Sequence, residues 1–135
     1  LPIEIVSTGL PDIIMPVADI DTLNALQPDM AALAALSDEL AVTGVHAFAL
    51  TGDGFTAHVR NFGPLYGIDE ESATGTANAA LTHYLHRRGL VAVGDECRFV
   101  QGEAMQRPSV VSTVLCNDGV WVGGNCHIIA HGTLL

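Results

Sequence analysis

The sequence contains no lysine: its 135 residues carry five arginines against fifteen acidic side chains, giving a formal net charge of -10. Without lysine the chain cannot form a Schiff base, anchor pyridoxal phosphate or build the lysine-containing phosphate loop of nucleotide-binding proteins. The same charge balance provides no basic patch for a phosphate backbone or an anionic membrane surface. We therefore expect neither nucleic acid nor a membrane as a partner.

Long apolar runs and paired cysteines are also missing. No run approaches the roughly 18 residues of a membrane span, and the start lacks the positive segment of a signal peptide. Cys97, Cys116 and Cys126 are an odd number at spacings that fit neither a disulfide framework nor a zinc site. We expect reduced cysteines in a cytoplasmic protein. The first residue is not Met, which suggests processing or a piece of a longer chain.

Apolar residues are abundant, at 49% of the chain against 15% charged, so residues 1–135 are expected to form a single compact domain. A helix is predicted to begin at Pro28 and to be stopped by Gly44, and a second to cover residues 74–88. The alternation of apolar and polar residues, bounded by turn residues, predicts strands at residues 3–7, 12–17, 45–51, 55–62, 96–101, 110–116 and 120–130. This pattern indicates an α+β domain built mainly from antiparallel strands.

The second predicted helix has a clear apolar stripe and ends in two arginines followed by Gly89, a favourable C-terminal sequence. Asn78, Thr82 and His86 form a polar stripe on the same helix. A helix enclosed by a sheet should be apolar all round. We therefore expect a partner domain, bound water or a second copy of the chain to face this polar stripe.

Residues 67–77 (GIDEESATGTA) are the strongest candidate site, because three consecutive acids precede a turn of small residues and the start of the second helix. A helix N-terminus offers free backbone N–H groups and a partial positive charge, which suit a carboxylate ligand. A neighbouring acidic side chain could move a proton on that ligand. The alternative is that the acids only cap the helix and Gly75 only turns the chain.

Residues 60–64 (RNFGP) followed by residues 67–77 resemble the pattern R-x-F-x-P, G-x-x-E-D-P-x-T-G-S-A of the phenazine-biosynthesis PhzF-like family. Residues 99–109 (FVQGEAMQRPS) resemble its Q-G-x-x-M-G-R-P-S, and residues 120–124 (VWVGG) resemble its closing strand. Residues 6–11 (VSTGLP) resemble the start of the family's second half. The resemblance covers nearly the whole chain.

This resemblance implies the diaminopimelate-epimerase-like superfold, in which two similar domains each curl a β-sheet, barrel-like, around a central helix. The chain resembles only the second, C-terminal domain, so it would contribute half of an active site lying between two domains. The resemblance gives Glu71 the catalytic role, and it gives the helix start at Gly75, Thr76 and Ala77 the binding of the substrate carboxylate. The family's first domain carries a second proton-shuttling glutamate, and no segment here resembles it.

The chain departs from the family pattern at several positions. Glu71 replaces the usual aspartate and is one methylene longer, whereas Thr76 replaces serine and keeps the hydroxyl. Ser72 replaces proline, and Gln106 replaces the glycine before the arginine. The related racemases that use two thiols carry a cysteine in the helix-start loop, and the chain has no cysteine before Cys97, so a thiol mechanism is not expected.

The histidines suggest no site by spacing alone. His83 and His86 are three residues apart on the second helix, a spacing that can share a metal, but no third ligand is recognisable and no metal is expected. His46 and His58 alternate with apolar residues, which predicts positions on the polar face of strands.

Two functional hypotheses follow. In the first, the chain is a cofactor-independent isomerase that performs a proton shift or an epimerisation on a small carboxylate-bearing metabolite, completed by a missing N-terminal domain or by a homodimer partner. In the second, it is a non-catalytic module that binds small carboxylates or another protein as a stand-alone half-domain.

Overall fold

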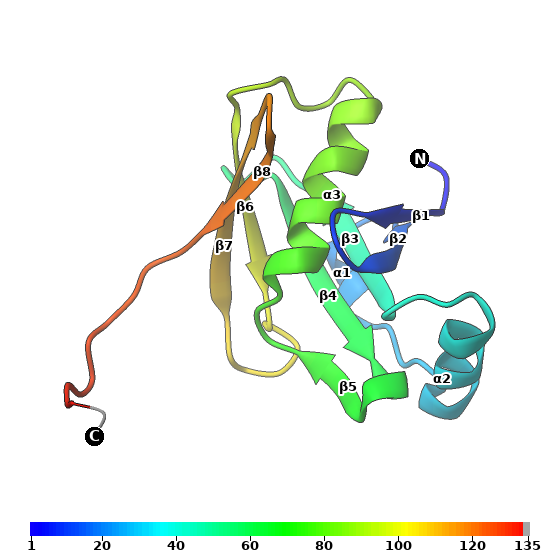
Figure 1. Cartoon of the computed structure of the whole chain (residues 1–135). Helices are drawn as coiled ribbons and strands as arrows, with labels where there is room; N and C mark the ends of the chain where they lie inside the picture. The colour runs from blue at the N-terminus through cyan, green and yellow to red at the C-terminus, as the bar shows by residue number, and fades with distance from the viewer. Residues whose placement is uncertain (134–135) are drawn as a thin grey trace.

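The computed structural model describes residues 1–133 as one curled sheet with a helix packed inside it (Figure 1). The strands are β1 (Glu4–Ser7), β2 (Pro11–Pro16), β3 (Val45–Leu50), β4 (Ala57–Gly63), β5 (Ile68–Glu71), β6 (Glu96–Gln101), β7 (Ser109–Cys116) and β8 (Gly119–Gly123). The helices are α1 (Ile20–Asn24), α2 (Met30–Glu39), the 3-10 turn η1 (Pro64–Tyr66) and α3 (Gly75–Arg87). None of these helices is both long and apolar enough to span a membrane.

The strands form a mixed sheet in the order β1-β2-β3-β4-β6-β7-β8, and β5 pairs with β4 beside this path. The pairs β2–β3 and β4–β6 are parallel, and the other pairs are antiparallel. The predicted α+β class, with a sheet curled around a central helix, is confirmed. The two parallel pairs arise where α1 and α2, and then α3, connect neighbouring strands.

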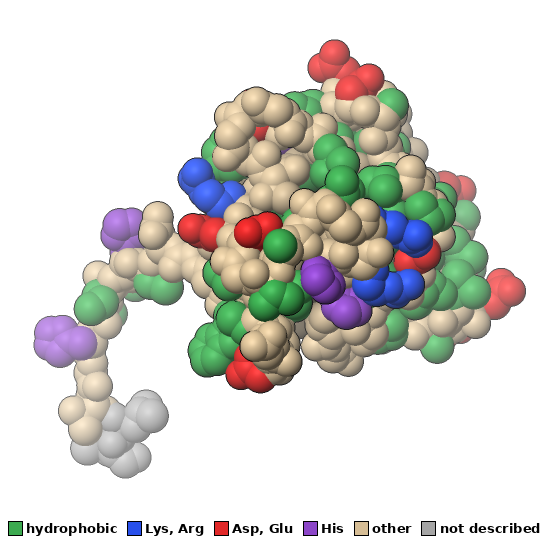
Figure 2. Space-filling model, turned by 90° about the horizontal axis from the view of Figure 1, so that it is seen from above, with side chains coloured by type: hydrophobic (Ala, Val, Ile, Leu, Met, Phe, Trp, Pro, Cys, Tyr) green, Lys and Arg blue, Asp and Glu red, His purple; other side chains and the backbone are tan. Residues whose placement is uncertain are grey.

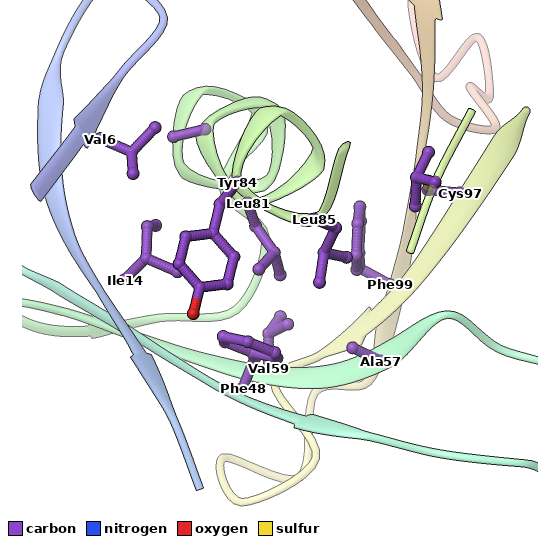
Figure 3. Packing of buried hydrophobic residues seen from close by; sticks show 12 residues of the cluster. Val6, Ile14, Phe48, Ala57, Val59, Leu81, Tyr84, Leu85, Cys97 and Phe99 are labelled. Carbon is purple, nitrogen blue, oxygen red and sulfur yellow. The ribbon is translucent and has the colours of Figure 1, made fainter. Parts of the chain in front are cut away.

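The core lies between α3 and the concave face of the sheet. Leu81, Tyr84 and Leu85 of α3 are fully buried and point toward Phe48 and Val59 of the central strands (Figure 3). The rings of Tyr84 and Phe48 meet edge to face, with 5.8 Å between centroids and an interplanar angle of 70°. Burial of this apolar stripe stabilises the position of α3, including its N-terminus.

The polar stripe of α3 is satisfied inside the domain, contrary to the expectation of an outside partner. The Thr82 hydroxyl lies 2.5 Å from the Thr113 hydroxyl of β7, and His86 Nδ1 lies 2.8 Å from the backbone oxygen of Val91. Asn78 hydrogen-bonds to β3 and β6 side chains described below. The domain therefore supplies a polar partner for each residue of the stripe: side chains of the sheet for Asn78 and Thr82, and the loop after α3 for His86.

Several element boundaries differ from the prediction. The helix predicted from Pro28 begins at Met30, because Asp29 caps it by accepting a hydrogen bond from the Ala32 N–H. The short α1, η1 and β5 were not predicted. The strand predicted at residues 120–130 ends at Gly123, where its pairing with β7 ends. A strand persists only beside a neighbour that accepts its hydrogen bonds, and residues 124–133 extend away from the body (Figure 1).

The prediction that His46 and His58 occupy polar faces is wrong, because both side chains are buried. His58 Nε2 lies 2.9 Å from Asp53 Oδ2, and its Nδ1 contacts the carboxylate of Glu103. Hydrogen bonds from Thr51 and from the Phe55 N–H, followed by the contact with His58, lower the pKa of Asp53 to about 2. His58 thereby joins the hairpin tip to the loop after β6.

Charged side chains are sparse on the face that Figure 2 shows, and the arginines there lie next to acidic side chains. An ion pair of this kind links the end of α3 to β1. Arg88 contacts the Glu4 carboxylate, and Arg87 Nη2 lies 3.5 Å from its other oxygen. The C-terminal end of α3 is therefore fixed by charge as well as by packing.

Candidate functional site

The strand β5 separates the three consecutive acids into different environments. Asp69 is exposed, whereas Glu70 forms a two-pronged ion pair with the buried Arg60, at 2.9 Å and 2.8 Å. Glu71 pairs in register with Asn61 of β4 and lines a pocket. Successive residues of a strand face opposite sides, so only one of the two glutamates is available to a ligand in this pocket.

The N-terminus of α3 lies beside Glu71. Thr74 is the N-cap residue, but its hydroxyl donates to Glu71 Oε2 at 2.5 Å and does not cap the helix. In contrast, Asp19 and Asp29 cap α1 and α2 with their carboxylates. The first N–H groups of a helix have no partner within it and carry a partial positive charge. The start of α3 can therefore receive an anion such as a carboxylate.

A pocket of about 290 Å³ brings these features together. Glu71 and Thr76 both line it, whereas Gly75 and Thr76 line an adjacent open hollow and the Ala77 side chain is fully buried. The pocket is lined by Leu10, Asp12, Thr43, Asn61, Gly63, Tyr66, Ile68, Glu71, Thr74 and Thr76. The predicted residues 71 and 75–77 thus lie around one end of α3.

The loop between Glu71 and α3 is held from inside by Gln101 at the end of β6. Gln101 Nε2 donates to the backbone oxygen of Glu71 at 2.8 Å and to the Thr74 hydroxyl at 2.9 Å. Its Oε1 accepts from the Thr74 N–H at 3.1 Å and from Asn78 Nδ2 at 3.0 Å. A single buried amide therefore positions the acid, the cap residue and the first turn of the helix.

A second layer of the network reaches β3. The imidazole of His46 lies 3.0 Å from Asn61 Oδ1 through Nδ1 and 3.2 Å from Asn78 Oδ1 through Nε2. Complete burial lowers the pKa of His46 to about 4, against the opposing effect of these two hydrogen bonds. The ring is therefore neutral at pH 7 and donates its single N–H to one of the two amides at a time.

The motif at residues 99–109 also acts on this loop. Ser109 Oγ donates to the backbone oxygen of Ser72 at 2.5 Å. Gly102 has a φ of +85°, and a Cβ there would lie 2.4 Å from the Arg107 oxygen and 2.9 Å from Ser72 Cβ. Glycine is required here because of both the backbone conformation and the close approach of the loop. The two separate sequence motifs therefore build one site.

Asp12 is the site residue that sequence reasoning missed. It lies at the start of β2, is 1% exposed and lines the same pocket as Glu71. Burial, and secondly the negative charge of Glu71, raise the pKa of Asp12 to about 6. An acid followed by two isoleucines in a predicted strand is the signal that could have identified it, because acids are seldom buried without function.

The hollow beside α2 offers few polar side chains. A larger hollow of about 490 Å³ beside α2 is lined almost entirely by apolar side chains, with Glu4 and Gln27 as the polar exceptions. Within residues 1–133 no group of three or more His, Cys, Asp or Glu side chains could hold a metal ion. His83 and His86 accordingly have no third ligand in this part of the chain.

Comparison with known proteins identifies the family. The model of the PhzC-PhzF family, described as phenazine biosynthesis-like protein, matches residues 1–132. The chain belongs to the PhzC-PhzF family. An uncharacterised isomerase of Deinococcus radiodurans is 37% identical over 115 residues, which cover 82% of this chain and 37% of the relative. A trans-2,3-dihydro-3-hydroxyanthranilate isomerase of Pseudomonas fluorescens is 36% identical over 110 residues, covering 82% and 37% respectively.

Solved structures of other proteins share the fold. A "Predicted Epimerase" from Pseudomonas aeruginosa superposes with a TM-score of 0.72 at 31% identity, over 99% of this chain and 45% of that chain. A PhzF family protein from Bacillus anthracis gives a TM-score of 0.74 at 22% identity, over 90% and 44%. The chain thus spans between a third and a half of the length of these relatives.

Proposed function

We propose that the chain carries the Glu71 half of a cofactor-independent PhzF-like isomerase, which moves a proton beside the carboxylate of a small metabolite. The observation that carries the proposal is that Glu71 and the uncapped start of α3 border the same pocket. The isomerase names of several relatives support it. The absence of lysine agrees with chemistry that needs only carboxylates and backbone N–H groups.

We propose a role for each residue on the basis of its position around the start of α3. The N–H groups of Gly75, Thr76 and Ala77 hold the substrate carboxylate and stabilise the negative charge that develops on it when the neighbouring carbon loses a proton. Glu71 takes up that proton as a general base. The hydrogen bond from the Thr74 hydroxyl fixes the Glu71 carboxylate.

We propose that a second unit completes the site, because the chain spans less than half of its relatives and the pocket is open to solvent. This unit is either a missing N-terminal domain or a second copy of the chain in a homodimer. Sedimentation of the 135-residue chain distinguishes them: a dimer favours the second copy, and a monomer favours a separate domain. Carboxylate binding without turnover, both by the chain alone and by the chain together with a completing domain, would favour the non-catalytic binding module.

The experiment that tests the catalytic proposal is turnover of trans-2,3-dihydro-3-hydroxyanthranilate, the compound named for one relative, followed by other small carboxylic acids. With any acid that the chain isomerises, Glu71→Gln is expected to abolish turnover and leave the fold intact. Asp69→Asn is the matched control, because this acid is exposed two residues away, and full turnover is expected. Unchanged turnover in Glu71→Gln would refute the assigned role.

A further inference from the structure

Asp12 occupies a position that packing alone does not explain. In β2 its side chain points to the same side as Ile14, toward the inner face of the sheet, where Val6 of β1 pairs with it. Its Oδ1 is buried and has no hydrogen-bond partner among residues 1–133. A buried carboxyl without partners destabilises a fold, so its presence in a pocket points to a ligand or a proton to be carried.

The groups around Asp12 do not neutralise it. Glu71 of β5 is a second acid in the same pocket, and Tyr66 of η1 and Thr76 of α3 are uncharged there. On β3 the nearby titratable group is His46, whose two ring nitrogens already face Asn61 and Asn78. The pocket therefore contains two carboxyl groups and no cationic side chain, so one proton stabilises the pair.

We propose that Asp12 is a second acid–base group of the Glu71 pocket, able to exchange a proton with a carboxylic acid bound there. This inference rests on the proposed function and deepens it. Burial and the charge of Glu71 hold a proton on Asp12 at mildly acidic pH, at which an ordinary aspartate is ionised. This half of the site then carries an acid as well as a base.

The proton balance is complete. The Glu71 carboxylate removes a proton from the carbon beside the bound carboxylate and becomes neutral. The electron pair moves through the conjugated system to a second carbon, which takes the proton of the Asp12 carboxyl and leaves Asp12 ionised. A proton passes from Glu71 to Asp12, directly or through water, and restores both groups. Nothing is oxidised or reduced, and the product is an isomer of the substrate.

Carboxyl carbon NMR titration of the 135-residue chain tests the inference without a substrate. The Asp12 signal is expected to titrate at about pH 6, and Glu71→Gln is expected to lower its midpoint because one negative charge is lost. Asp69→Asn should leave the midpoint unchanged. An Asp12 midpoint in the ordinary range, or one that Glu71→Gln does not move, would overturn the inference.

Benzoate, a simple carboxylate, serves as the binding probe in a second measurement. If Asp12 takes up a proton when the anion binds, benzoate affinity should rise by about tenfold per pH unit as the pH falls from about 8 to about 6. In Asp12→Asn the affinity should be nearly constant over this range. Equal pH dependence in both proteins would overturn the role of Asp12, whereas no binding at any pH would instead contradict the carboxylate site at α3.

Discussion

Replacing Asp12 by asparagine is expected to stabilise the fold at neutral pH while impairing the pocket. The pKa of Asp12 rises from 3.8 to about 6 on folding, mainly through burial. At about 1.4 kcal/mol per pKa unit, the ionised carboxyl costs about 3 kcal/mol of folding stability at pH 7. The buried amide of the variant loses its hydrogen bonds to water, which lowers the folding stability by about 1 kcal/mol. The net gain at pH 7 is therefore about 2 kcal/mol.

The pH dependence of the stability difference between Asp12→Asn and wild type distinguishes an effect of Asp12 ionisation from an effect of packing. Because the folded state binds the Asp12 proton more tightly than the unfolded state, wild-type stability gains from Asp12 protonation as pH falls from about 6 to about 4. The lowered pKa of His46, about 4, reduces folding stability as the pH falls. This effect is the same in both proteins, so it cancels from their difference. The stability difference between Asp12→Asn and wild type should therefore shrink from about 2 kcal/mol at pH 7 to a small loss near pH 4.

Urea denaturation of both proteins at several pH values measures this difference. Asp69→Asn, at an exposed position, is the control and should stay within about 0.5 kcal/mol of wild type throughout. A difference between Asp12→Asn and wild type that is the same at all pH values would contradict the raised pKa, because it would mean that Asp12 has an ordinary pKa in the folded chain.

Three further predictions concern the support of the site. Gln101→Leu should lower the free energy of unfolding by about 3 kcal/mol, because it leaves several buried polar groups unpaired. Gln27→Leu, at an exposed position, is the control and should change this free energy little; urea denaturation measures both. Gly102→Ala should lower the free energy of unfolding by about 2 kcal/mol or more in the same assay, since its Cβ would collide with the loop that carries Ser72. It should also weaken benzoate binding, and unaltered binding would contradict the close approach of this loop to Gly102. Thr82→Val and Thr113→Val should each cost about 1 kcal/mol, and the double variant should cost less than their sum; additive losses would mean that the two hydroxyls do not interact.

The fold was largely predictable from local patterns. The β3–β4 hairpin and the helix ending before Gly89 each depend on residues close in sequence, and these predictions agree with the structure to within a few residues. The end of β8 was not predictable, because it depends on where a neighbouring strand stops. The short β5 was missed because its four residues include three acids, and tertiary pairing with β4 outweighs their low strand propensity.

The site was only partly predictable for a related reason. Sequence motifs identified Glu71 and the start of α3, but alternation alone could not decide which of the three acids faces the pocket until β5 was paired with β4. The contacts of Gln101 and His46 join strands far apart in sequence, so spacing gives no sign of them. The same holds for Asp12, whose importance depends on burial beside Glu71.

We propose above all that Glu71 moves a proton on a carboxylate bound at the start of α3. The experiment incubates the chain, together with any unit that completes its site, in deuterated water with a carboxylic acid that it isomerises, and measures deuterium incorporation beside the carboxylate by NMR. We predict incorporation with wild type and with Asp69→Asn, and none above the uncatalysed rate with Glu71→Gln. Equal incorporation in wild type and Glu71→Gln would contradict the role of Glu71.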